Sequence, residues 1–434
     1  MPYSGRQANH SLSVLFVCHN FPSEQSGLGG TELYTVNLAR TLLSRNIHAA
    51  VLHPVYDSDS EESNCPQWTA FQGIDIIRVY VSDQNDFSTS LSAGAWYEPL
   101  MAELSQHPFD IVHFQHMTGS VAPTLAKELL KLKKHKFFLT LHDGNILCEQ
   151  NHFMLPNNNI CDGPSSGQKC AECWLERHQI NENHDALSAL SSGMEKRLAL
   201  MRAITVEMDG IIVPTHFLRT RMENHHFSLR NVIQRPLGLM FFPVSPRVEN
   251  RKLRFAFLGN LNRTKGIDLL LGAFPKVQNG NLELHLYGKN TSVIDFVHLE
   301  EALEQLGIFY HGPYLPEKLP EILSQIDVGI VPSRSDNFPT VVREFFHANV
   351  PVIGSAAGGI PELITHGVTG RLFQSNSVDG LVEELQYITA HPEVLETYRE
   401  NIKPQFNMET DALELKEIYE NVLNTAKVQS IRPI

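Results

Sequence analysis

The sequence has no apolar run as long as the roughly 18 residues that a membrane-spanning helix needs. Its first ten residues, MPYSGRQANH, also lack the apolar core of a secretory signal peptide. Basic residues are in the minority, with 35 Lys and Arg against 48 Asp and Glu, and the net charge of −13 argues against non-specific nucleic-acid binding. We therefore expect a cytoplasmic protein that does not bind nucleic acid.

Cysteine is also scarce, and four of the six cysteines fall within one short segment: Cys148, Cys161, Cys170 and Cys173. The close pair Cys170 and Cys173 has the spacing of zinc ligands, and nearby glycines would let the chain fold around an ion. Disulfides are disfavoured in the cytoplasm. A structural zinc ion would order the irregular insert 143–180. Reduced or redox-labile cysteines remain an equal alternative, and an iron–sulfur cluster is a weaker one.

The 434 residues are enough for two sizeable domains, and 42% of them are hydrophobic. Short apolar runs alternate twice with helix-periodic segments, a pattern typical of doubly wound parallel sheets in an α/β protein. Strands are predicted at 12–18, 47–52, 74–79, 111–114, 137–141 and 210–214, and again at 253–259, 282–287, 307–310, 328–331, 352–353 and 371–373.

The linker between the two alternations is the segment 235–251, which contains three prolines. We place an N-terminal domain at 1–235, which includes the insert 143–180, and a C-terminal domain at 236–408. A last helix lies within 409–434, and the pattern leaves open whether it packs back on the N-terminal domain or on the C-terminal one.

A glycine-rich turn, Gly27-Leu28-Gly29-Gly30, follows the first predicted strand and precedes a helix. Glycines at such a place allow a phosphate to approach backbone N–H groups. The spacing matches neither the dinucleotide fingerprint nor the P-loop, because Glu32 stands at the last glycine position and no Gly-Lys-Ser/Thr follows. The alternative is a flexible connecting loop.

The stretch 331–362 carries the clearest strand–turn–helix signal. A loop follows the strand 328–331, and Pro339 stands where the first turn of a helix tolerates a missing N–H. Free N–H groups at such a turn hold phosphate. Asp336 precedes the turn and Glu344 lies two turns further on, and their carboxylates are suited to sugar hydroxyls.

Further polar side chains stand at or after the ends of predicted strands, at the edge where open α/β sheets bind ligands. Lys265 precedes a helix in the second domain and is suited to phosphate; its alternative is a solvated lysine. His142 follows the strand 137–141; His113 lies within the strand before it, 111–114, and His116 follows that strand. A lone histidine at a strand end is more often structural, but two such places in one sheet favour a site, with His142 the stronger candidate.

These motifs in this order resemble the retaining glycosyltransferases of family four, which have the GT-B fold. The resemblance covers nearly the whole chain and rests on Gly29–Glu32, Thr140–Asp143, Phe257–Asp268, Asp336–Glu344, Pro351–Gly354 and Gly358–Glu362. It implies two facing Rossmann-like domains with an interdomain cleft. The C-terminal domain would bind a nucleotide-diphosphate sugar donor, and the N-terminal domain the acceptor.

The resemblance also implies roles for single residues. Lys265 would contact the donor diphosphate, and Glu344 the ribose. Asp336 and His142 would lie beside the reacting sugar as the catalytic residues. The remaining donor-binding residues would be Gly29 and Gly30 of the first loop, Asn260 and Arg263 of the second-domain loop, and Phe338, Pro339, Thr340 and Val341 at the helix start.

The chain departs from the family pattern at two of these positions. Asn260 stands where the family usually has arginine, so one charge partner of the diphosphate is missing unless Arg263 or Arg334 replaces it. Asp336 stands where the family has glutamate, one methylene longer.

The expected function is thus retaining sugar transfer from a nucleotide-diphosphate sugar to a hydroxyl of a glycan or a lipid-linked acceptor. The resemblance implies that no cofactor or catalytic metal is required, and the family setting of polysaccharide or glycolipid assembly suggests peripheral association with the inner membrane surface. Two alternatives remain: a nucleotide-sugar-binding protein with weak or no transfer activity, and an epimerase or phosphorylase of the same fold.

Overall fold

The computed structural model describes residues 12–21, 29–56, 65–81, 95–117, 121–132, 134–180, 184–248, 252–292, 294–296 and 298–430. The chain divides into two compact units. Unit 1 comprises Met1–Phe153, Asp162–Met240 and Phe406–Ile434, and unit 2 comprises Met154–Cys161 and Phe241–Gln405. The chain thus passes between the units within a few residues of the boundaries expected at 235 and 408, and in addition the short segment Met154–Cys161 of the insert belongs to unit 2.

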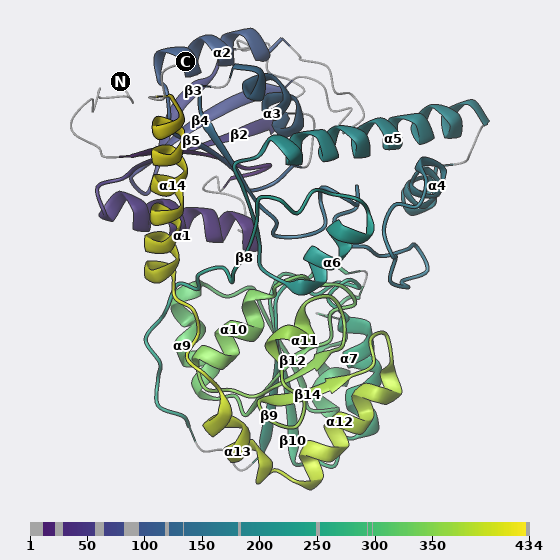
Figure 1. Ribbon diagram of the computed structural model, residues 1–434. Coiled ribbons are helices and arrows are strands. Elements are labelled where there is room, and N and C mark those ends of the chain that lie inside the picture. Colours follow the sequence, from purple (N-terminus) through teal and green to yellow (C-terminus); the bar gives the residue numbers. More distant parts are fainter. Residues whose placement is uncertain are drawn as a thin grey trace. The chain divides into compact units, whose positions relative to one another are not determined.

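Unit 1 is built on an eight-stranded sheet with the order β3-β4-β2-β1-β5-β6-β7-β8 (Figure 1). All neighbouring strands are parallel except β3 and β4. The strands are β1 (Ser13–Val17), β2 (His48–Tyr56), β3 (Gln67–Phe71), β4 (Ile74–Val81), β5 (Ile111–Phe114), β6 (Lys136–Thr140), β7 (Gly210–Val213) and β8 (Val232–Gln234). The six predicted strands of this half are confirmed; the edge strands β3 and β8 were not predicted.

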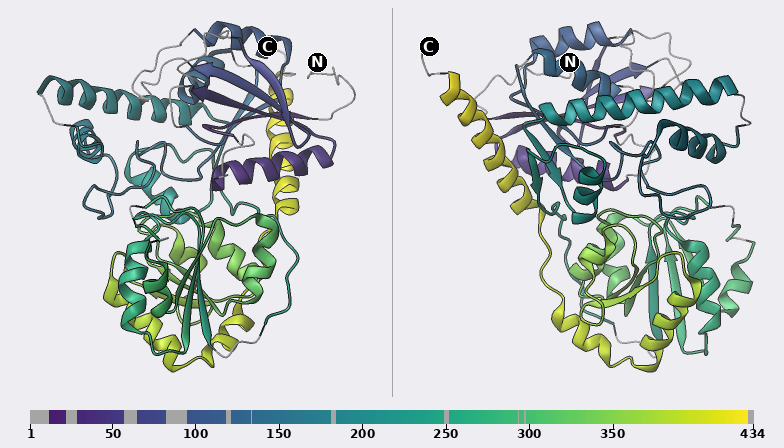
Figure 2. Two further views of the ribbon diagram at one scale, coloured as in Figure 1. Left: turned by 180° about the vertical axis from the view of Figure 1, so that it is seen from behind. Right: turned by 45° about the vertical axis from the view of Figure 1, so that its right-hand side comes forward.

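The helices of unit 1 are α1 (Gly30–Ser44), α2 (Tyr97–Gln106), α3 (Val121–Leu132), α4 (Gly167–Arg177), α5 (His184–Glu207), α6 (His216–Asn224) and α14 (Met408–Ser430). The interpretation of 143–180 as wholly irregular is wrong, because α4 lies within it. Ser166 caps α4 by accepting a hydrogen bond from the Lys169 N–H, and the helix packs along α5 (Figure 2). Its weak apolar pattern concealed it, since it packs mainly on one neighbour.

The last helix, α14, lies beside α1 in unit 1 (Figures 1 and 2). Its anchor is Asp411, whose side chain is fully buried. One carboxylate oxygen of Asp411 accepts hydrogen bonds from the Tyr34 hydroxyl at 2.8 Å and the Gly238 N–H at 2.5 Å, and the other pairs with Arg235 at 2.9 Å. A carboxylate this far from water is retained only because cationic and N–H or O–H partners replace its hydration.

Unit 2 is built on a six-stranded parallel sheet with the order β11-β10-β9-β12-β13-β14 (Figure 1). The strands are β9 (Leu253–Leu258), β10 (Leu282–Tyr287), β11 (Ile308–Gly312), β12 (Val328–Val331), β13 (Val352–Ser355) and β14 (Gly370–Phe373), and all six were predicted. The helices are α7 (Ile267–Ala273), α8 (Glu300–Gln305), α9 (Leu319–Ser324), α10 (Thr340–His347), α11 (Ile360–Leu363), α12 (Val378–Ala390) and α13 (Val394–Asn401), with short 3-10 helices η1 (Phe274–Lys276) and η2 (Pro316–Lys318).

Each face of the unit 2 sheet has its own apolar core. Phe255 and Leu284 face α7 and α12, whereas Ala256 and Leu258 face α9 and α10. Neighbouring residues of a strand point to opposite faces, so the continuous apolar run of β9 is what a sheet covered on both sides requires. In each unit, therefore, the ends of the parallel strands are the places left for polar side chains.

No helix in the described part of the chain is long and apolar enough to cross a membrane.

Candidate active site

Two loops of unit 2 meet at the carboxyl edge of its sheet. The first, 259–266, connects β9 to α7, and the second, 332–339, connects β12 to α10. The Arg334 N–H of the second loop donates a hydrogen bond to the Thr264 carbonyl of the first at 2.8 Å. Gly266 has a φ of 76°, and a Cβ at this position would lie 2.0 Å from the Pro332 carbonyl oxygen. Only glycine permits this approach of the two loops.

The close approach brings together two predicted site residues, Lys265 and Asp336. The Lys265 ammonium lies 2.6 Å from a carboxylate oxygen of Asp336, which also accepts a hydrogen bond from the Ser333 hydroxyl at 3.3 Å. The Lys265 backbone is fixed from its other side, because its N–H donates to Asn262 Oδ1 at 2.9 Å. The Lys265 ammonium is thus held at the carboxyl edge of the unit 2 sheet, and the lysine side chain is partly exposed to solvent.

The glycine pair of the predicted motif Gly358–Glu362 fixes the position of Asp336. The Gly359 N–H donates to the Asp336 carbonyl at 2.9 Å. Gly358 has a φ of 59°, and a Cβ there would lie 1.9 Å from the same carbonyl oxygen. The motif therefore helps to place Asp336.

The buried residue Arg334 does not replace the missing arginine at position 260. Its two terminal nitrogens donate to the two carboxylate oxygens of Asp268 at 2.7 and 2.8 Å, and its Nε donates to Asn376 at 2.8 Å. Burial alone would raise the pKa of Asp268, but these hydrogen bonds and the charge of Arg334 hold it below its usual value. Of the two candidates, only Arg263 stays available, with a side chain 71% exposed and 3.7 Å from Asp268. Asn260 is also exposed.

The helix α10 begins one residue later than predicted, at Thr340, and Pro339 precedes it as the N-cap. The proline has no N–H to offer, so the first free donors of the helix belong to Thr340 and Val341. Phe338 lies under the guanidinium of the buried Arg343, 4.8 Å from ring centre to Cζ. The turn 336–341 is therefore fixed by two contacts, the Gly359 hydrogen bond to the Asp336 carbonyl and the packing of Arg343 on Phe338.

Glu344 lies one turn into α10 and is half-buried. Burial raises the pKa of this carboxyl to about 7, although the charge of Arg343 opposes the shift. Tyr314, in the loop after β11, lies close enough for the Glu344 charge to raise the pKa of its hydroxyl further than burial alone. A carboxyl that is so poorly hydrated benefits from donors such as the hydroxyl groups of a ligand.

In unit 1, the carboxyl ends of β1, β5 and β6 bring three histidines to one edge. His142 Nε2 lies 2.8 Å from Gln115 Oε1, and His116 Nε2 lies 3.0 Å from Asp143. The third histidine is His19, whose ring centre lies 4.2 Å from that of His116, with the two ring planes tilted by 38°. Burial, then the neighbouring His116, lowers the pKa of His142 to about 3, so the predicted catalytic histidine is neutral at pH 7.

Three members of this cluster were not predicted as site residues, His19, Glu32 and Gln115, whereas His116 was a weaker candidate than His142. His19 Nε2 lies 3.3 Å from Glu32 Oε1 at the start of α1, directly after Gly29 and Gly30. The signal was present in the sequence, since His19 and Gln115 each follow a predicted strand. His113, by contrast, is structural: it is fully buried and bonded to the Tyr419 and Thr140 hydroxyls at 2.5 and 2.8 Å.

The predicted zinc ligands are the four cysteines of the insert 143–180. Within the described ranges there is no set of three or more His, Cys, Asp or Glu side chains placed to hold a metal ion. Cys148, Cys170 and Cys173 belong to unit 1, and Cys161 belongs to unit 2. Structural zinc therefore stays a prediction, which metal analysis of the purified protein tests.

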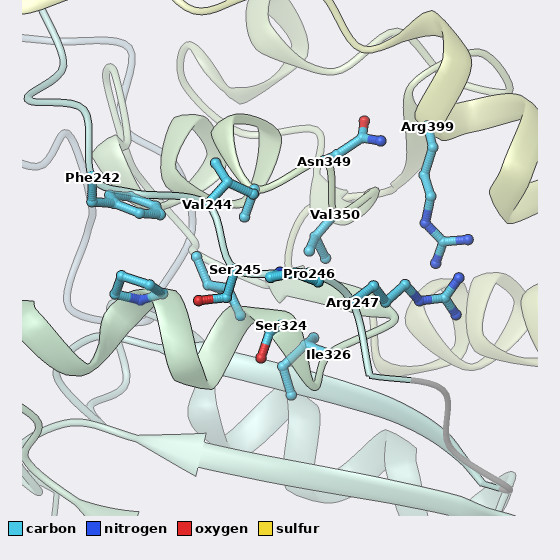
Figure 3. A pocket seen from close by; sticks show the side chains of 13 residues that line it. Phe242, Val244, Ser245, Pro246, Arg247, Ser324, Ile326, Asn349, Val350 and Arg399 are labelled. Carbon is cyan, nitrogen blue, oxygen red and sulfur yellow. The ribbon is translucent and has the colours of Figure 1, made fainter.

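A cavity of about 260 Å³ in unit 2 lies away from the candidate site, at the amino ends of β12 and β13 (Figure 3). The linker residues Phe242–Arg247 form one wall. The guanidinium groups of Arg247 and Arg399 converge at one end of the cavity, where both approach the buried carboxylate of Asp327. This ion cluster fastens the linker to the domain, and none of the predicted donor-binding residues lines the cavity.

Known families match both units. The model described as Glycosyltransferase Family 4 matches residues 28–236, and the model described as Glycosyl transferases group 1 matches residues 242–405. The chain belongs to the family-four glycosyltransferases. These two matches include Gly29, Gly30 and His142 in the first and Lys265, Asp336 and Glu344 in the second.

The chain is also similar in sequence or in structure to individual proteins. An uncharacterized 41.2 kDa protein in the cps region of Klebsiella pneumoniae is 28% identical over 84% of this chain and 88% of its own length. Sucrose-phosphate synthase from Thermosynechococcus elongatus has 18% identity, a TM-score of 0.69 and coverage of 95% of this chain and all of its own. Anabaena HepE in complex with UDP has 15% identity, a TM-score of 0.63 and coverage of 94% and 100%. The two α/β units have the GT-B fold, and the protein is a sugar-transferring enzyme.

Proposed function

We propose that this glycosyltransferase moves a sugar from a nucleotide-diphosphate sugar to a hydroxyl acceptor with retention of anomeric configuration. The observation that carries the proposal is the pairing of Lys265 with Asp336, beside the free N–H groups that begin α10. A fixed cation and helix N–H donors are suited to a diphosphate, and a carboxylate next to them is suited to sugar hydroxyls.

The donor is a nucleoside-diphosphate sugar bound by unit 2. Lys265 and the N–H groups of Thr340 and Val341 bind its phosphates, Glu344 its ribose, and Asp336 its sugar. The solved structure of HepE with UDP supports a uridine nucleotide as the first donor to test. Because Asn260 adds no charge and Arg334 is committed to Asp268, Arg263 is the remaining cation for the diphosphate.

In the reaction, the bond from the anomeric carbon to the acceptor oxygen forms as the bond to the diphosphate oxygen breaks. Lys265 and the start of α10 stabilise the negative charge that develops on the departing diphosphate. Same-face attack, in which the departing phosphate takes the acceptor's proton, accounts for retention without a protein nucleophile. With that charge met by Lys265 and N–H groups, the proposed chemistry requires no metal ion.

The acceptor is a hydroxyl of a glycan or of a lipid-linked glycan, bound by unit 1 at the edge where His142, Gln115 and His116 gather. A lipid-linked acceptor would place the reaction at the inner membrane surface.

A second candidate function is nucleotide-sugar binding with weak or no transfer. Two observations favour it: the neutral Asn260 at a position where the family carries a cation, and the short carboxylate of Asp336. Calorimetry separates the two functions, because a binding protein would take up the donor but turn over none of the acceptors offered.

The test is a transfer assay with a panel of uridine, guanosine and adenosine diphosphate sugars and with neutral glycans as acceptors. Proton NMR of the product reports whether the anomeric configuration of the donor is kept. We expect retention, and turnover that survives a chelator. An inverted product, or activity that is lost with the chelator and restored by a divalent ion, would contradict the mechanism.

A further inference from the structure

The carboxyl edge of the unit 1 sheet contains two buried polar atoms without a hydrogen-bond partner, His19 Nδ1 and Gln115 Nε2. Gln115 is fully buried, and its Oε1 is taken by His142. Leaving such an atom unpaired costs about 1–3 kcal/mol. Two in one cluster indicate that a ligand with hydrogen-bonding groups completes the site.

The contact of His19 with Glu32 indicates whether its second ring nitrogen, Nδ1, donates or accepts a hydrogen bond. Nε2 faces the Glu32 carboxylate at 3.3 Å, so this nitrogen carries the proton and Nδ1 presents a lone pair. Burial lowers the pKa of His19 to about 3, with His116 adding to the effect, so the ring stays neutral. Nδ1 therefore accepts a hydrogen bond but does not hold a proton at pH 7.

The Glu32 carboxylate is itself fixed at the start of α1. It accepts hydrogen bonds from the backbone of Gly29 and Glu32. Its oxygen Oε2 would lie 2.5 Å from a Cβ at Gly29, so the side chain is folded tightly against the helix start. This anchoring lets Glu32 hold the His19 ring in one tautomer, in the way that a carboxylate orients a histidine in other enzymes.

His116, whose ring lies against that of His19, is also paired with a carboxylate. The nearly fully buried His116 pairs with Asp143, and the two imidazole rings lie 4.2 Å apart. His116 thus limits the rotation of the His19 ring, whose side chain is 32% exposed.

We propose that His19 Nδ1 and Gln115 Nε2 bind a hydroxyl of the acceptor sugar, with Glu32 as the residue that positions His19. A hydroxyl group donates one hydrogen bond and accepts others, so it satisfies a bare nitrogen and an amide N–H together. The class of ligand is a neutral polyhydroxyl compound, since the described residues of the cluster include no unpaired lysine or arginine for an anion. This inference rests on the proposed function, in which the acceptor's proton leaves with the diphosphate and not with His19.

The first experiment measures transfer by the wild type and by His19→Asn, with neutral hexoses and their methyl glycosides as acceptors. Loss of one hydrogen bond raises the KM for the acceptor about tenfold. The KM for the donor, which unit 2 is proposed to bind, is measured alongside and reports any general loss of structure in the variant. The matched control is His48→Asn, because His48 also lies 3.3 Å from a carboxylate, Asp75, but at the amino end of its strand.

The second experiment measures the tautomer by nitrogen-15 NMR of labelled histidine. Wild-type His19 is expected to carry its proton on Nε2. Glu32→Gln, whose amide donates to Nε2, shifts the proton to Nδ1 and raises the acceptor KM as His19→Asn does, whereas Glu32→Asp retains the wild-type tautomer. A purely capping role of Glu32 would lower the melting temperature without moving the His19 tautomer.

The outcomes separate this inference from the proposed function. Transfer by the wild type with an unchanged acceptor KM in His19→Asn overturns the inference alone, as does a wild-type proton on Nδ1. A wild type that transfers no sugar contradicts the proposed function; titration with the same hexoses then decides about His19, because an Nδ1 resonance that does not move overturns the site.

Discussion

Lys265 and Asp336 form an ion pair of 2.6 Å across two loops of unit 2, although 71 positions separate them in the chain. The pair joins the loop after β9 to the loop before α10, and the backbone bond from Arg334 to Thr264 runs beside it. Asp336, which is one methylene shorter than the glutamate of the family pattern, thus pairs with Lys265. In the proposed function, this lysine binds the donor diphosphate.

The placement of Asp336 depends on Gly358, and this gives the first prediction. Gly358→Ala should lower kcat/KM by tenfold or more, because a Cβ cannot lie 1.9 Å from the Asp336 carbonyl oxygen and the loop must move. The matched control is Gly280→Ala. Gly280 also has a positive φ, 84°, but a Cβ there would meet no atom within 4 Å, so this variant should show only backbone strain of about 1–2 kcal/mol. Equal losses of activity in both variants would contradict the role of the glycine.

The second prediction concerns pH and Glu344. Its folded-state pKa of about 7 lies above the ordinary 4.5, so the folded protein keeps a proton that the unfolded chain releases. The free energy of unfolding therefore falls as the pH rises from about 4.5 to about 7. Above pH 7 the ionised Glu344 makes it lower by up to about 3 kcal/mol than it is below pH 4.5.

Urea denaturation of the wild type and of Glu344→Gln at pH 5 and pH 8 measures this effect. The variant should lose less stability between the two pH values, since it has no carboxyl to ionise. Donor affinity of the wild type should rise over the same window, because an ionised Glu344 accepts hydrogen bonds from ribose hydroxyls more strongly. Identical pH dependence in both proteins would show that Glu344 is not the titrating group.

The third prediction tests the anchor of the last helix. Asp411→Ala leaves Arg235 buried without its main partner and should lower the free energy of unfolding by about 3–5 kcal/mol. Glu414→Ala removes the half-exposed partner of the same arginine, at 2.9 Å, and should cost less than about 1 kcal/mol. Chemical denaturation followed by circular dichroism checks both values. A small effect at Asp411 would mean that α14 is held by its apolar contacts alone.

The sequence predicted twelve of the described strands, because short apolar runs between helix-periodic segments are the signature of a covered parallel sheet. It did not predict β3, whose five residues are mostly half-buried, or β8, which has only three. Such strands depend on pairing with a neighbour, as β3 does with β4 through the turn at Gln72 and Gly73, both of which have positive φ.

Single site residues followed from local motifs, but their pairings did not. Lys265 and Asp336 each stand in a recognisable strand–loop–helix turn, whereas their contact requires the folded sheet. Arg334 and Arg263 looked equivalent as substitutes for a missing cation, and only the bidentate bond to Asp268 distinguishes them. His19 and Glu32 were separated by the glycine-rich turn, so their contact depends on how β1 and α1 are placed.

The most direct test of the whole account is the steady-state kinetics of Lys265→Ala against those of Lys276→Ala, with the best donor of the panel. Lys276 also forms an ion pair, at 3.1 Å with Asp379, but both side chains are exposed. If Lys265 stabilises the departing diphosphate, kcat falls about 10²–10³-fold in Lys265→Ala and less than about twofold in Lys276→Ala. Unchanged turnover in a folded Lys265→Ala protein would contradict the assignment of the donor site.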